Sequence, residues 1–216
     1  MHAYLSRLGI RPDVQEFFAP FYSGDPNGDL IFWHGKEAEH FGLGFHRVPL
    51  SAGLWLAGNL NLSQVRQVII SGCALDAVSW LNKKAAYLPH FDNLLFVSTG
   101  AGITQEHILW VNAQLQHKEC CLINSRDLTG AMADLKLASA IRNQPAEIYF
   151  LEGNVEVQFR LRAFSFNQEN FSLNAFEKAA RFRFGVRTEK PKKHLTFFDE
   201  LKAEAFFTFN LNYGNP

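Results

Sequence analysis

Three short and almost unbroken apolar runs divide the middle of the chain. They are Val68–Ile70, Leu94–Val97 and Cys120–Ile123, and each is closed by small or polar residues. A segment of helix length follows each run, with apolar residues spaced three to four apart, as on the buried side of a helix. Strands joined by helical crossovers are typical of a parallel sheet that is covered on both faces. The pattern therefore predicts an α/β core whose site lies at the carboxyl ends of its strands.

The helices of this core are predicted from the same spacing. We expect them over Ala74–Lys84, over Gln105–Gln116, and from a cap at Asp127 or Thr129 to Arg142. In the first helix, Ala77, Val78 and Leu81 are spaced to face the sheet; the apolar residues of the second are Ile108, Leu109, Val111 and Leu115. The turn Thr99-Gly100-Ala101-Gly102 precedes that helix, and its exposed N–H groups are suited to an anion. The longer dinucleotide fingerprint is absent.

Shorter elements are predicted on both sides of the core. The first 24 residues predict two short helices, followed by paired strands at Leu30–Trp33 and Phe41–Val48. After Pro145 we expect antiparallel strands at 147–152 and 155–164, then helices at 173–180 and 196–207. The chain thus divides into an N-terminal helix-hairpin unit (1–66), an α/β core (67–144) and a C-terminal extension (145–216). One continuous fold is the alternative, since no linker marks a boundary.

Composition narrows the class of protein. Lys plus Arg and Asp plus Glu each number 21 among 216 residues, so no overall basic field points to nucleic acid. The three cysteines lack a Cys-x-x-Cys spacing, and no apolar run has the roughly 18 residues of a membrane span. We therefore expect a cytoplasmic protein without a membrane partner. His34, His40 and His46 match no zinc pattern and are expected to be surface or packed residues.

Three segments of the core carry a resemblance to a known family. They are IISGCALDAVSWL, LLFVSTGAG and LINSRDLTGAMADLKLA, in this order between residues 67 and 142. Together they resemble the signature segments of the Toprim domain, especially the form found in primases of plasmids, phages and mobile elements. In that family a glutamate ends the first strand, an aspartate lies four residues later, and Asp-x-Asp ends the third strand. The resemblance implies a Toprim-like, mostly parallel sheet with flanking helices.

The family's catalytic carboxylates are only partly present. Counting back from Asp76 puts Gly72 at the position of the glutamate, and a shift of one residue puts Ser71 there. Asp127 matches the second aspartate of Asp-x-Asp, whereas Ser125 stands at the first. In active members the glutamate is the general acid or base and the aspartates hold Mg²⁺, which prefers carboxylate oxygens. The resemblance therefore implies a degenerate site.

Two hypotheses remain for the carboxylates that are left. Asp76 and Asp127 could share a weakly held Mg²⁺ ion at the strand ends, if the two loops converge as the family's fold implies. Alternatively, Asp76 packs or caps locally, and Asp127 begins a helix in favourable contact with its dipole. No other cofactor is indicated by the sequence.

A basic segment near the C-terminus is the second candidate site. Between residues 181 and 193 six basic side chains stand against Glu189 alone, and Arg160 and Arg162 extend this group if the strands adjoin. Such cations neutralise phosphates without reading base sequence. The alternative is a solvated edge strand guarded by charge. The candidate nucleic-acid contacts are Arg160, Arg162, Arg181, Arg183, Arg187, Lys190, Lys192 and Lys193.

These observations lead to one hypothesis and two alternatives. The chain is expected to be a catalytically degenerate Toprim-like protein that binds nucleic acid or serves as an accessory module. Its setting would be a primase-like or mobile-element replication or transfer system, with replication or mobilisation proteins as further partners. The first alternative is an active Mg²⁺-dependent nucleic-acid enzyme of the primase or nuclease type. The second is a protein-interaction subunit that does not bind nucleic acid.

Overall fold

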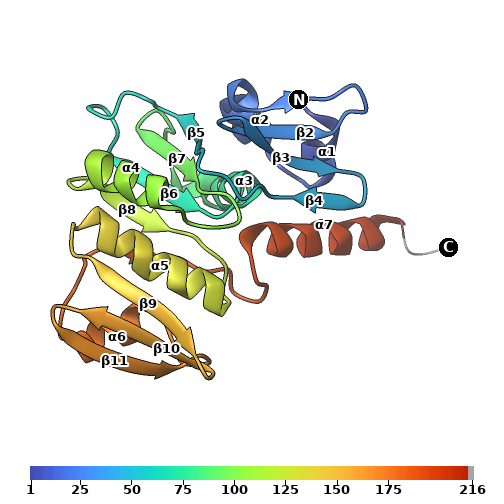
Figure 1. Cartoon of the computed structure of the whole chain (residues 1–216). Helices are drawn as coiled ribbons and strands as arrows, with labels where there is room; N and C mark the ends of the chain where they lie inside the picture. Colours follow the sequence, from blue (N-terminus) through green and yellow to red (C-terminus); the bar gives the residue numbers. More distant parts are fainter. Residues whose placement is uncertain (214–216) are drawn as a thin grey trace.

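A five-stranded mixed sheet forms the centre of the computed structural model, which describes residues 1–213, with side chains to residue 206 (Figure 1). The strand order is β12-β8-β6-β7-β5. Strands β12, β8, β6 and β7 run parallel to one another, and β5 closes the far edge in the antiparallel direction. Their bounds are β5 Trp55–Gly58, β6 Gln67–Ser71, β7 Leu94–Ser98, β8 Glu119–Leu122 and β12 Arg187–Thr188.

Helical crossovers connect the parallel strands, which confirms the predicted α/β core. Helix α3 (Ala74–Lys84) joins β6 to β7, and α4 (Gln105–Leu115) joins β7 to β8. Helix α5 (Leu128–Ile141) follows β8. Helix α3 packs on one face of the sheet, whereas α4 and α5 pack on the other. With both faces covered, the strands have to be apolar throughout.

Alternate residues of each strand enter two separate cores. Ile69 and Phe96 face α3, whereas their neighbours Val68, Ile70 and Leu95 face α4 and α5. All five side chains are buried. This division follows from the period of two in a strand and accounts for the unbroken apolar runs in the sequence. Among the apolar residues of α4, Leu109 is 60% exposed, because Val111 and Leu115 form the buried side of the helix.

The N-terminal unit packs against the face that carries α3. It contains helices α1 and α2, the short 3₁₀ helix η1 and a four-stranded antiparallel sheet. The expected strand pair is in fact a meander, because most of the segment between the two predicted strands belongs to strand β3. The bounds are α1 Ala3–Arg7, α2 Pro12–Phe18, η1 Ala19–Phe21, β1 Ser23–Gly24, β2 Leu30–His34, β3 Glu37–Gly42 and β4 Phe45–Arg47.

The C-terminal extension adds a three-stranded antiparallel sheet over α5. Its strands are β9 (Ala146–Leu151), β10 (Asn154–Phe159) and β11 (Arg162–Asn167), followed by α6 (Leu173–Ala180). The single strand expected at 155–164 is wrong, because the chain reverses at Arg160 and Leu161. Both residues have positive φ, 49° and 63°, as in a two-residue hairpin turn. Leu161 is consequently fully exposed instead of lying beside Val157.

The end of the chain returns to the core. Strand β12 pairs with β8, so the central sheet takes strands from all three segments predicted in the sequence. Helix α7 (Phe197–Tyr213) then packs against α3 and the N-terminal unit through Phe197, Phe198 and Leu201. Over the described residues, no helix combines the length and the apolar character needed to cross a bilayer.

The buried aromatic cluster should dominate stability. Phe96 is fully buried, and its ring lies 5.1 Å from that of Phe18 and 6.2 Å from that of Trp80. We expect Phe96→Ala to lower the free energy of unfolding by about 3–5 kcal/mol, because it removes contacts and leaves a cavity. Leu109→Ala is the control and should change it by less than about 0.5 kcal/mol. Urea denaturation measures both, and similar losses in the two variants would contradict this assignment of the core.

Candidate functional site

A cavity of about 500 Å³ lies at the carboxyl ends of the parallel strands. The residues that follow β6, β7 and β8 line it, represented by Gly72, Thr99 and Ser125. The N-terminal unit contributes His46, and the segment before α7 contributes Thr196. We call this space the strand-end cavity. Its position agrees with the expected place of a site in a parallel α/β sheet.

A buried glutamate from the N-terminal unit caps the helix beside this cavity. Glu39 lies on β3 and is fully buried. Its carboxylate accepts hydrogen bonds from the backbone N–H of Ala74 at 2.6 Å and of Leu75 at 3.2 Å. These groups begin α3, whose first residue has no cap from the preceding side chain. The glutamate thereby satisfies two N–H groups and meets the positive end of the helix dipole.

Two histidines approach the same carboxylate. His46 Nε2 lies 2.9 Å from Glu39 Oε1, and His34 Nε2 lies 3.6 Å from Oε2. Burial by itself raises the pKa of Glu39, but His34, His46 and the Ala74 amide outweigh it, so the pKa lies below its ordinary value. Glu39 is therefore an ionised carboxylate inside the protein. His34 is fully buried, whereas His46 is partly exposed and lines the strand-end cavity.

Cys73 and Asp76 are further side chains at the edge of the cavity. Cys73 is the residue before α3, and burial, together with the negative charges of Asp76 and Glu39, raises the pKa of its thiol well above the ordinary value. Asp76 accepts a hydrogen bond of 2.9 Å from the backbone N–H of Phe198, at the start of α7. Burial, which disfavours the charged carboxylate, raises the pKa of Asp76 to about 6.

The positions matched to the Toprim carboxylates are thus placed as follows. Gly72, Asp76 and Ser125 line the strand-end cavity, whereas Asp127 is not among its lining residues. Asp127 caps α5, accepting from the backbone N–H of Gly130 at 2.8 Å and from Ser125 Oγ at 2.6 Å. Asp127 therefore begins a helix, as in the second of the two hypotheses, whereas Asp76 is buried in the first turn of α3 and bonds to the start of α7, a contact that is not local in the sequence. Neither belongs to a cluster of three potential metal ligands within the described part of the chain.

Three of the candidate basic residues are engaged in ion pairs. Lys190 Nζ lies 2.6 Å from buried Asp134 and also donates to the carbonyl oxygens of Asn124 and Ser125. Arg183 pairs with Glu177, and Arg187 pairs with Glu189. The segment around Arg183 is not a strand, so Arg181 and Arg183 do not lie on an edge strand.

The other five candidate cations are exposed: Arg160, Arg162, Arg181, Lys192 and Lys193. Among the described residues, no carboxylate lies within ion-pair distance of any of them. The guanidinium group of Arg160 lies over the ring of Phe182 at 4.2 Å, and that of Arg162 lies over Phe164 at 5.0 Å. Lys192 lies beside exposed Arg126, which donates to its carbonyl oxygen at 2.6 Å.

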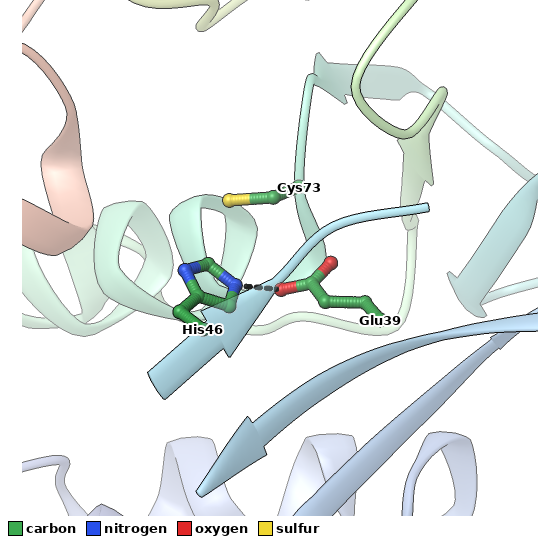
Figure 2. A group of neighbouring side chains, drawn as sticks. All are labelled: Glu39, His46 and Cys73. Carbon is green, nitrogen blue, oxygen red and sulfur yellow. Dashed lines mark hydrogen bonds and ion pairs between the residues drawn. The ribbon is translucent and has the colours of Figure 1, made fainter. Parts of the chain in front are cut away.

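The meeting of Glu39, His46 and Cys73 was missed by sequence reasoning. No cysteine stands near the histidines along the chain, but the fold brings Cys73 to them from the end of β6 (Figure 2). The sequence signal that could have revealed the cluster is Glu39, an acidic residue in the middle of strand β3. A carboxylate that is buried needs polar partners. A second group, Asp25, Asp29 and His40, lies partly exposed on the N-terminal sheet.

The raised pKa of Asp76 predicts a pH-dependent stability. Below about pH 4 the carboxyl group is protonated in both the folded and the unfolded state. Between about pH 4 and pH 6 the unfolded chain ionises while the folded protein does not, so stability falls over this interval and levels off above pH 6. The shift from 3.8 to about 6 corresponds to about 3 kcal/mol of lost stability above pH 6. Asp76→Asn keeps an acceptor for the Phe198 amide, so we expect it to be more stable than wild type at pH 8.

Urea denaturation in EDTA buffer at pH 4 and pH 8 measures this difference. The advantage of Asp76→Asn at pH 8 should disappear at pH 4. Asp127→Asn serves as the matched control, because that carboxylate also caps a helix but is exposed. An Asp76→Asn variant that is equally destabilised at both pH values would show that the carboxylate is stabilising in its charged form.

Comparison with known proteins identifies no relative of the chain. No family model, no curated protein and no solved structure matches the chain. The resemblance to the Toprim domain therefore stays a prediction that rests on the three sequence segments, and the function has to be argued from the geometry of the site.

Proposed function

We propose that the chain is a nucleic-acid-binding accessory protein without Mg²⁺-dependent phosphoryl-transfer activity. It would bind phosphates through exposed lysines and arginines, at the edge of the strand-end cavity and on the C-terminal extension. Its proposed setting remains the primase-like or mobile-element replication or transfer system that the Toprim resemblance implies. The three cysteines are free thiols, which supports a reducing compartment such as the cytoplasm.

The main support for the proposal is a difference between the carboxylates and the cations at the edge of the strand-end cavity. The carboxylates are bonded to helix starts, whereas the lysines and arginines are exposed. Asp76 is buried and bonded to the start of α7, and Asp127 is bonded to the start of α5. A Mg²⁺ ion would have to compete with both helix termini for its ligands, and it also dehydrates reluctantly. The loss of the family's glutamate at Gly72 removes the general acid or base as well. The geometry therefore favours binding over metal-assisted chemistry.

The exposed lysines and arginines are the groups that would bind phosphate. Lys192 and Lys193 lie beside Arg126, which directly follows cavity residue Ser125. Arg160 lies in the β10–β11 turn, where it donates to Gln144 Oε1, and Arg162 is the first residue of β11. Cations with no carboxylate partner are free to replace the counterions of a phosphate backbone. Helix starts would contribute less than usual, because α3, α5 and α7 are already capped by carboxylates.

Fluorescence anisotropy with labelled single- and double-stranded oligonucleotides tests the proposal. We expect binding that weakens with salt and is the same in Mg²⁺ and in EDTA. The double variant Lys192→Gln/Lys193→Gln should reduce the slope of log affinity against log salt by about 1 to 2, because each phosphate contact contributes roughly 0.7–0.9. Arg162→Gln/Arg181→Gln should act in the same direction if the extension contributes.

A matched control removes two positive charges elsewhere. Arg7 and Arg66 are exposed residues outside the strand-end cavity, so Arg7→Gln/Arg66→Gln should leave the slope unchanged. Binding that requires Mg²⁺, and is lost in Asp127→Asn, would instead favour the active enzyme. Absence of binding at low salt would overturn the proposal and favour the protein-interaction subunit.

A further inference from the structure

Three side chains with different ligand chemistry meet beside the strand-end cavity. They are the Glu39 carboxylate, the His46 imidazole and the Cys73 thiol (Figure 2), and one ligand atom of each lies within 4.8 Å of the other two. They come from β3, from β4 and from the turn between β6 and α3. The cluster is therefore held by rigid elements from two parts of the fold, which is the arrangement that a preorganised site requires.

The ligand atoms lie within 4.8 Å of one another, which brackets the spacing in a metal centre. Zinc bonds of about 2.0–2.3 Å to nitrogen, oxygen and sulfur place the ligand atoms of a tetrahedral site roughly 3.3–3.8 Å apart. His46 Nε2 and Glu39 Oε1 are 2.9 Å apart, in a direct hydrogen bond. An ion would displace this hydrogen bond and move the two atoms apart by less than about 1 Å. Cys73 lies above the imidazole ring in Figure 2.

We propose that Glu39, His46 and Cys73 bind a divalent transition-metal ion, with Zn²⁺ as the favoured ion. Thiolate and imidazole are ligands that select Zn²⁺ over Mg²⁺ and Ca²⁺, which take oxygen ligands. Three protein ligands leave the fourth position for water or substrate, as in catalytic zinc sites. His46 and Cys73 both line the strand-end cavity, so that position faces the cavity. The proposed nucleic-acid surface does not depend on this site.

A second observation points to the same ligand. His34 is fully buried; its Nε2 pairs with Glu39, whereas its Nδ1 has no hydrogen-bond partner in the described residues. Its Nε2 lies 3.6 Å from Glu39 Oε2, so the ring is aimed at the cluster. An unpaired buried polar group is costly, and in native proteins it commonly marks a site completed by a water or an ion. His34 is thus available as an outer partner of Glu39 or as a further ligand.

Metal binding balances the charges of the cluster. The Cys73 thiol gives its proton to solvent when it becomes a thiolate ligand, and His46 binds through a deprotonated ring nitrogen. The ion then holds one thiolate and one carboxylate, which neutralise its two positive charges. The two backbone N–H groups of α3 continue to orient Glu39. In other metal sites, outer partners, which are groups hydrogen-bonded to the metal ligands, orient those ligands in the same way.

Cobalt and zinc binding to the whole chain test the proposal. The reduced protein, stripped with EDTA and exchanged into chelator-free buffer, should bind one Co²⁺ ion with thiolate-to-metal charge-transfer absorption in the near ultraviolet. Zn²⁺ should displace it, with an affinity measured by competition against a chromogenic chelator. Cys73→Ser should abolish the charge-transfer band. It should also weaken Zn²⁺ binding by more than the roughly 10- to 100-fold that the loss of an outer partner costs.

Cys120→Ser is the matched control, because Cys120 is also a buried free thiol but lies in the other core. This variant should keep the band and the zinc affinity of wild type. His46→Gln retains an amide donor for Glu39 and should weaken zinc binding while the protein stays folded by circular dichroism. A wild-type protein without the band, or a band that persists in Cys73→Ser, would overturn the proposal. Because the charge-transfer band is first sought in the wild-type protein, its absence there overturns the proposal even where a variant does not fold.

Discussion

The arrangement of the molecule depends on one buried carboxylate. Glu39 belongs to the N-terminal sheet, yet its hydrogen bonds are made to the start of α3 and to His46. An ionised group removed from water is tolerated only with such partners, and separating them costs several kcal/mol. The N-terminal unit is therefore fixed to the core at the point where β6 ends. That attachment brings His46 and Val48 to the wall of the strand-end cavity.

Carboxylates recur at the starts of the helices around the cavity. Glu39 caps α3, Asp127 caps α5, and Asp76 accepts from the start of α7. In many α/β proteins these positive helix ends receive the anionic part of a ligand. Here the protein supplies its own anions, so phosphate would be left to lysine and arginine side chains.

The sequence predicted the core well because buried parallel strands leave a strong pattern. The runs at Val68, Leu94 and Cys120 and the helices after them lie where expected. Failures occurred where one residue decides the conformation, as at Arg160, whose positive φ no local pattern indicates. Asp127 was predicted as a cap because caps are local. Glu39 could not be paired with Ala74 or His46 with Cys73, because these contacts depend on how two separate units pack.

The two-residue strand β12 has a consequence for how the protein is made. Arg187 pairs with Cys121, a partner that leaves the ribosome some 66 residues earlier. Until then β8 is an unpaired edge of a parallel sheet, and such edges are sites of aggregation in nascent chains. Lys190, just beyond β12, forms an ion pair with buried Asp134. Pairing of β12 with β8 therefore also neutralises a buried charge. Completion of the sheet is thus a late step in synthesis, and a ribosome that stalls before residue 187 would expose a chain prone to pair with its neighbours.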